Sequence, residues 1–161
     1  MRVYLERPSA SSRTEYEAAV QRSGKLHAPW VTAPPYKALL RRRKSKTHVH
    51  FLVRLKGTRE LVGMVNVSEI VRGALRSAYL GYCAFAPHER QGLMTEGLRL
   101  AIAHAFGPLK LHRVEANIQP GNKPSRSLVR KLGFRREGYS PRYLKIRGRW
   151  RDHERWALLA D

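Results

Sequence analysis

The sequence has little cysteine, few acidic residues and no long apolar run. Its single cysteine, Cys83, among 161 residues excludes an internal disulfide and a thiolate-rich zinc site. No apolar stretch reaches the length of a membrane span, and the first twenty residues lack the apolar core of a secretion signal. No repeat or low-complexity segment is evident. We therefore expect one domain over residues 1–161, no membrane partner, and the cytoplasm as the default location.

The shortage of acidic residues gives the chain an unusual charge. Thirty-two Lys and Arg stand against twelve Asp and Glu, a formal net charge of +20. The basic residues are densest in "RRRKSK" (41–46) and over residues 126–155. Such a charge attracts polyanions and favours work near nucleic acid, including ribosomal RNA. An arginine-rich composition without any such role explains it equally well.

Apolar periodicity and turn residues predict an α/β sheet with helices on its faces. Three strands joined by short turns should form an antiparallel meander, and the later strands, separated by helices, should be parallel. Gly107-Pro108 and Gly133 mark the ends of the last two helices. The predicted helices are 9–23, 36–43, 93–106 and 122–131, and the predicted strands are 48–55, 61–70, 77–85, 111–118 and 154–159.

The stretch "ERQGLMTEGLRLAIAHAF" (89–106) combines a glycine-containing loop with an amphipathic helix. Backbone amides at a helix N-terminus have no intrahelical partner and carry partial positive charge. The loop also follows a strand of an α/β sheet, which is where such sheets bind ligands. We therefore expect an anion site here rather than an ordinary helix start.

Three segments in this order resemble the GNAT superfamily of acetyl-CoA-dependent N-acetyltransferases: "YLGYCAFAPHERQGLMTEGL", "LHRVEANIQPGNKPSRSLVRKLGFRREG" and "GRWRDHERWAL". Within the superfamily they are most similar to the RimJ/RimL-type branch, the ribosomal-protein-alanine N-acetyltransferases. The resemblance implies the GNAT fold, a mixed sheet splayed at the cofactor site. It also implies acetyl-CoA as co-substrate, no metal, a protein N-terminus as acceptor, and a monomer or homodimer.

The resemblance also implies which residues hold the cofactor. Backbone amides of the loop bind the pyrophosphate, the strand before the loop lies beside the pantetheine arm, and an asparagine at the head of the later helix contacts that arm. Glu89, Arg90 and Met94 depart from the usual loop pattern, and the negative charge of Glu89 is unfavourable near phosphates unless its side chain points away. The implied cofactor residues are Cys83, Ala84, Phe85, Arg90, Gln91, Gly92, Leu93, Met94, Thr95, Asn122 and Ser125.

For catalysis, the resemblance points to a serine. Many relatives carry a tyrosine acid seven residues after the asparagine, where this chain has Val129, and the alanine-acetylating branch uses a serine that matches Ser125. Asn122 and Ser125 also fit a plain helix cap. For the general base we select Glu69, although an ion pair in an arginine-rich chain is the better explanation of each candidate taken singly. The other candidates are Glu96, Glu137, Asp152 and His153.

Acceptor recognition is less defined. A protein α-amine, with a pKa near 8, needs only a weak base, whereas a lysine amine near 10.4 needs a stronger one. Tyr139, Tyr143 and Trp150 could form a loop over the entrance, opposite "HAPW" (27–30), or pack in a C-terminal hairpin. Two alternatives remain: acetylation of a small-molecule amine, and a non-catalytic basic module that binds RNA or the ribosome. His48 and His50 share a strand face but have no third metal ligand nearby.

Overall fold

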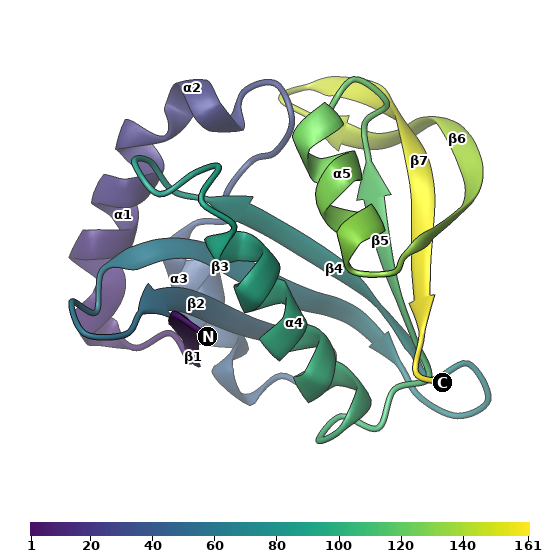
Figure 1. Cartoon of the computed structure of the whole chain (residues 1–161), viewed down its shortest axis with the longest axis horizontal. Coiled ribbons are helices and arrows are strands. Elements are labelled where there is room, and N and C mark those ends of the chain that lie inside the picture. Colours follow the sequence, from purple (N-terminus) through teal and green to yellow (C-terminus); the bar gives the residue numbers. More distant parts are fainter.

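The central element is a mixed seven-stranded sheet with helices on both faces, seen in a computed structural model that describes residues 1–161 (Figure 1). The strand order is β1-β2-β3-β4-β5-β7-β6, and only the β4–β5 pair is parallel. The strands are β1 (Val3–Glu6), β2 (Val49–Leu55), β3 (Leu61–Val71), β4 (Ser77–Ala84), β5 (Arg113–Ile118), β6 (Arg135–Ile146) and β7 (Arg149–Leu159).

The helices divide between the two faces of the sheet and close a core on each. Helices α4 and α5 cover one face, where 23 buried residues form the larger core. Helices α1 and α3 cover the other face through a smaller core that includes Tyr16 and Leu39. The helices are α1 (Arg13–Arg22), α2 (Gly24–His27), α3 (Tyr36–Arg41), α4 (Leu93–Phe106) and α5 (Lys123–Lys131), with 3-10 turns η1 (Ala10–Ser12) and η2 (Arg42–Lys44).

The sheet opens between β4 and β5. The two strands pair only from Ser77–Tyr79 to Arg113–Glu115, and beyond that point they diverge (Figure 1). Their carboxyl-terminal halves therefore present unpaired edges to each other. The predicted α/β fold with a splayed sheet is confirmed, and so are the antiparallel meander and the bounds of α4.

Two edge strands were not predicted from the sequence. β1 is only four residues long, and β6 alternates poorly because eight of its twelve residues are exposed. The prediction that the later strands are all parallel is wrong for β7. β6 and β7 form a hairpin, and its β7 arm lies antiparallel to β5 as well. A tight hairpin can only join antiparallel strands, so the missed β6 caused the error.

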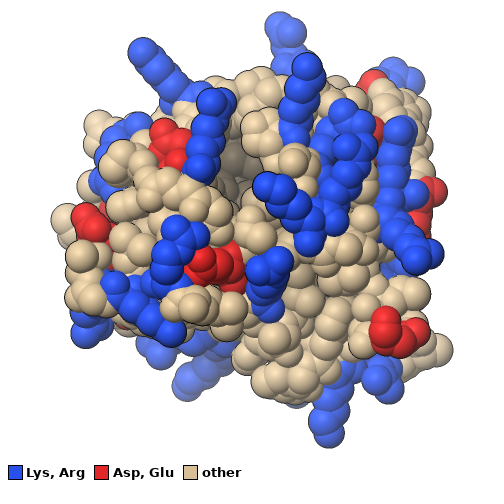
Figure 2. All heavy atoms as spheres, in the orientation of Figure 1, with Lys and Arg blue, Asp and Glu red and all other residues tan.

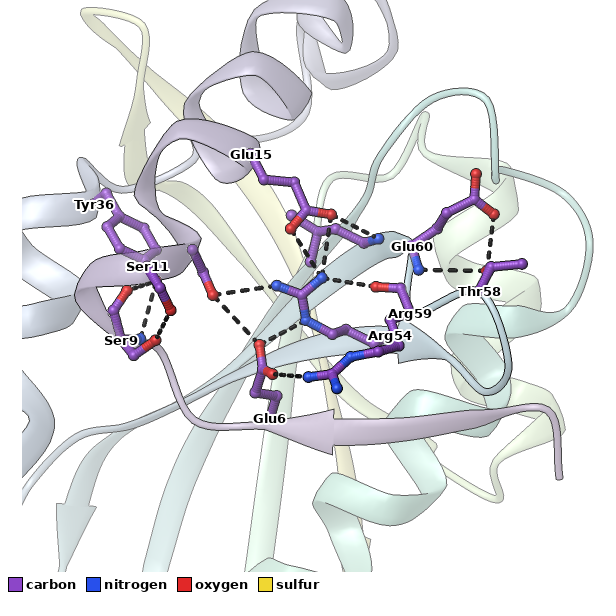
Figure 3. Close-up of polar contacts among 11 residues, drawn as sticks. Glu6, Ser9, Ser11, Glu15, Tyr36, Arg54, Thr58, Arg59 and Glu60 are labelled. Carbon is purple, nitrogen blue, oxygen red and sulfur yellow. Dashed lines mark hydrogen bonds and ion pairs between the residues drawn. The ribbon is translucent and has the colours of Figure 1, made fainter.

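A buried arginine joins the first helix to the sheet (Figure 3). The side chain of Arg54, on β2, is 7% exposed and pairs with Glu6 at 2.6 Å and Glu15 at 2.9 Å. It also donates to the Ser12 hydroxyl and to the carbonyl of Arg59. Because its donors have partners from β1, α1 and the β2–β3 turn, this cationic group can be buried at modest cost.

Candidate active site

A cavity of about 600 Å³ opens where β4 and β5 separate. Its walls are the end of β4, the loop before α4, the end of β5, α5, and the segment from α2 to Val31. The structure therefore gathers all the sequence-predicted cofactor residues around one hollow except Phe85, which is fully buried. Figure 2 shows the hollow between projecting lysine and arginine side chains, and Lys25, Arg90 and Lys131 line it.

The loop before α4 forms one wall of this cavity. Arg90 and Gly92 both have left-handed backbone, with φ of 61° and 76°, and Gly92 is the N-cap of α4. Leu93 and Met94 bury their side chains in the core, so only their backbone can serve a ligand. Four amides at the start of a helix lack intrahelical acceptors. The loop thus combines left-handed backbone with the free amides of a helix start at the cavity wall, the features on which the predicted anion site depends.

The N-terminal strand holds this loop in place. The Arg2 guanidinium contacts the Glu96 carboxylate at 2.7 Å and donates to the carbonyl of Gln91 at 3.0 Å. The Arg2 backbone amide donates to Glu96 as well, and these hydrogen bonds lower the pKa of that carboxyl. Glu96 therefore ties β1 to the first turn of α4, where a negative charge is favourable.

One edge of β4 borders the cavity. The amide of Phe85 donates to the carbonyl of Val62 on β3. Because alternate residues direct their backbone groups to opposite edges, the open edge belongs to Tyr82 and Ala84. The Ala84 carbonyl accepts a hydrogen bond from Nε2 of His27 at 2.8 Å. Burial raises the pKa of the Cys83 thiol to about 12, so Cys83 packs as a small apolar residue, as predicted.

Helix α5 places Ser125 against a partly buried tyrosine. Asn122 caps the helix by accepting a hydrogen bond from the Ser125 amide, which confirms the predicted cap. The Ser125 hydroxyl lies 2.6 Å from the phenol oxygen of Tyr82. Burial raises the pKa of Tyr82 to about 12, so the phenol keeps its proton at neutral pH. Tyr82 was missed in the sequence, although strand alternation places it on the same face as Leu80, toward the α4 and α5 side.

The opposite wall is tied to the end of β5. The Gln119 side-chain amide donates to the carbonyls of Pro29 and Trp30, and the Trp30 ring lies against Gly121. The "HAPW" segment thus forms one wall of the cavity, but the aromatic residues predicted to lie opposite it do not line the cavity. Asn117 also lines the cavity, and its Oδ1 is buried without a partner. By strand alternation Asn117 faces away from α5, so the cavity has polar groups from both sides of the sheet.

None of the five candidate bases lines the cavity. Glu69, with an exposed side chain at the far end of β3, lies 3.6 Å from His48. Glu137 pairs with Arg113, and Asp152 accepts hydrogen bonds from the Tyr139 phenol and the Arg142 amide. His153 is buried, and burial lowers the pKa of its imidazole. Glu89 is the one carboxylate in the cavity wall, with Oε2 buried and unpaired.

The C-terminal aromatic residues lie on strands of the sheet, and the pair of histidines lies where β2 begins. Tyr139 and Tyr143 lie on β6 and Trp150 on β7, so the expected entrance loop is instead part of a hairpin. The rings of His48 and His50 lie 6.1 Å apart, and no group of three or more His, Cys, Asp or Glu gathers anywhere in the chain. None of the helices has both the length and the apolar character needed to cross a membrane.

The family follows from comparison with known proteins. Residues 2–135 match the family model described as an acetyltransferase (GNAT) domain, so the chain belongs to the GNAT acetyltransferases. A solved structure of Mycobacterium smegmatis RimJ in complex with CoA-disulfide superposes with a TM-score of 0.89 at 29% identity, covering 98% of this chain and 82% of that one. The predicted family is confirmed, and this neighbour agrees with the RimJ/RimL-type branch.

Two curated relatives match part of the chain. The probable N-acetyltransferase YjcK of Bacillus subtilis is 41% identical over 68% of this chain and 61% of its own length. The ribosomal protein uS5-alanine N-acetyltransferase of Escherichia coli is 43% identical over 62% of this chain and 52% of its own length. The matched region therefore spans about half to three fifths of these relatives.

Proposed function

We propose that this protein transfers an acetyl group from acetyl-CoA to the α-amine of a protein or peptide, with N-terminal alanine or serine preferred. The observation that carries the proposal is the cavity at the β4–β5 opening, where the unpaired start of α4 and the Ser125–Tyr82 pair face one hollow. The Escherichia coli relative named as a ribosomal protein uS5-alanine N-acetyltransferase supports the choice of acceptor.

The residues present fit coenzyme A. The left-handed loop at Arg90–Gly92 and the first amides of α4 would hold the pyrophosphate, and Arg90 could pair with a phosphate directly. The open edge of β4 would pair with the amides of the pantetheine arm, and Asn122 would lie beside it. When bound, the co-substrate supplies an acetyl thioester, from which coenzyme A leaves as a thiolate when the acetyl group is transferred. The unpaired Glu89 carboxylate would oppose phosphate, which makes affinity the quantity to measure first.

Ser125 would protonate the departing thiolate, and Tyr82 would assist it. In this arrangement the Tyr82 phenol donates to the Ser125 oxygen, which frees the serine hydroxyl to donate toward sulfur. Because the pKa of Tyr82 is raised to about 12, the phenol remains a donor throughout the neutral range. Serine alone is a weak acid, so a hydrogen bond that stabilises its conjugate base is the help it needs.

The amine side of the site favours an acceptor that is already partly neutral. The cavity has no carboxylate outside its phosphate loop, and the α-amine of a protein, with a pKa near 8, loses its proton far more readily than a lysine. The unpaired Oδ1 of Asn117 could accept a hydrogen bond from that amine. Polyamines would be repelled by a chain of net charge +20.

The test combines the purified protein, acetyl-CoA and peptides that begin with alanine, serine or methionine, with a lysine peptide of blocked N-terminus as control. Free thiol and peptide mass are measured. One acetyl group on the alanine and serine peptides only is expected. Acetylation of the blocked lysine peptide, or of small amines alone, would contradict the acceptor. Absence of acetyl-CoA binding would favour a non-catalytic basic module.

A further inference from the structure

The tip of the β6–β7 hairpin concentrates positive charge, and none of its basic side chains forms an ion pair with a carboxylate. Between Ser140 and Arg151 the sequence "SPRYLKIRGRWR" has five basic residues and no acidic one. The acidic residues that follow are already engaged: Asp152 accepts from Tyr139 and Arg142, and Glu154 pairs with two arginines of other elements. We call residues 142–151 the hairpin tip. Its basic residues are Arg142, Lys145, Arg147, Arg149 and Arg151.

The hairpin tip is built as a defined ribbon. The turn residues Arg147 and Gly148 both have positive φ, 50° and 79°, which matches the two-residue turn that joins twisted strands most tightly. Further down, the pairing shifts between Ser140 and Leu144, where the Asp152 carboxylate binds the Arg142 amide and fixes the bulge. The charged side chains thus project from an ordered backbone, which lowers the entropy lost on binding.

An exposed aromatic ring lies among these charges. The Trp150 side chain is 60% exposed, and Trp150 pairs across the hairpin with Lys145. Leu144, 39% exposed, pairs with Arg151. Exposed aromatic rings interleaved with cations are the surface that single-stranded nucleic acids use, because bases stack on the ring while phosphates contact the cations. An apolar membrane or protein contact would not explain five unpaired cations.

The run at 41–46 gives a natural comparison. It also holds five basic residues, but it lies on η2 and its flank, and no aromatic residue interrupts it. A surface that binds by net charge alone would use both regions equally. We infer that the hairpin tip is a binding surface for single-stranded RNA, separate from the cavity and independent of acetyl transfer.

The test measures binding of a fluorescent oligouridine by anisotropy over a series of salt concentrations, without acetyl-CoA. In the hairpin variant Arg142, Lys145, Arg147 and Arg149 become Gln. In the control, Arg41, Arg43, Lys44 and Lys46 become Gln, so that both variants lose four exposed charges. Loss of four phosphate contacts should reduce the slope of log K against log salt by about 3 in the hairpin variant. The control should change it far less.

Trp150→Ala separates stacking from charge. It should weaken oligouridine binding about tenfold or more while leaving the salt slope unchanged, because stacking contributes without ion release. Thermal melting of each variant checks that it is folded. Equal loss in the two charge variants, or no effect of Trp150→Ala, would overturn the inference. So would equal binding of polyglutamate or of anionic lipid vesicles, because either would show attraction to charge alone.

Discussion

The hydrogen bond between Tyr82 and Ser125 predicts a specific kinetic effect. Tyr82→Phe keeps the ring in place and removes only the phenol oxygen that lies 2.6 Å from the serine hydroxyl. A hydrogen bond of this kind contributes about 0.5–1.5 kcal/mol, so kcat should fall roughly 2- to 10-fold. The KM for acetyl-CoA should stay nearly constant, because the ring still packs against the cavity wall. Thiol release under saturating peptide measures both constants.

Ser125→Ala should cost more, because it removes the acid itself. General acids contribute about 10²- to 10⁴-fold, so kcat should fall by at least about 10²-fold. If Tyr82 acts only through Ser125, the double variant should be no slower than Ser125→Ala alone. Independent effects would instead multiply, and the double variant would lose a further 2- to 10-fold.

Tyr79→Phe provides the matched control. Tyr79 lies on the same strand, but its side chain is partly exposed and does not line the cavity. Its loss of a phenol oxygen should leave kcat unchanged. Multiplying effects in the Tyr82 and Ser125 double variant, or equal losses in the Tyr79 and Tyr82 variants, would refute the proposed relay. A raised KM for acetyl-CoA with unchanged kcat would make Tyr82 a binding residue only.

Stability and acceptor binding provide three more tests. Arg54→Met should lower the free energy of unfolding by about 2–3 kcal/mol, less than for a fully buried pair because both carboxylates are partly exposed. In urea denaturation the control Arg13→Met, which breaks an exposed helical pair, should cost under about 0.5 kcal/mol. Hydrogen bonds from Arg2 lower the pKa of the Glu96 carboxyl from its usual value of 4.5. The ionised carboxylate therefore stabilises the folded protein fully above pH 4.5, and this stabilisation is lost as the pH falls through the lowered pKa. The melting temperature of the Glu96→Gln variant should therefore change less with pH in that acid range than the melting temperature of the unmodified protein. The same dependence of melting temperature on pH in both proteins would contradict this. Asn117→Ala should lower kcat/KM for the peptide about tenfold in steady-state assays. Calorimetry should give the same Kd for acetyl-CoA as the unmodified protein. A higher Kd would instead assign Asn117 to binding of the cofactor.

The sequence predicts the elements with strong periodicity and clear ends. Helix α4 begins after Gly92 and ends before Gly107, and both boundaries agree with the structure because glycine marks each end. The Asn122 cap is likewise visible in sequence, since its side chain needs only the local amide of Ser125. Local chemistry determines these features, so the sequence alone is sufficient for them.

Features that depend on distant contacts could not be predicted. The Tyr82–Ser125 pair joins residues 43 positions apart, and strand alternation indicates the face on which Tyr82 lies but not its partner on the helix. Strand β6 was missed because its burial is irregular at an edge of the sheet. Glu69 was selected as a base for its place at the end of the second meander strand, whereas the structure shows left-handed backbone there, at a shift in strand pairing and away from the cavity.

The ion pairs of this basic chain bear on its chemistry. Nine of its twelve carboxylates form ion pairs with arginine or histidine, and an arginine partner keeps a carboxylate from acting as a free base. Of the other three, Asp152 binds the hairpin bulge, Glu60 binds Thr58, and Glu89 belongs to the phosphate loop. No carboxylate is thus left beside Ser125 to deprotonate a strongly basic amine. An acceptor that is already partly neutral at working pH removes this need, which is why the site suits an α-amine better than a lysine.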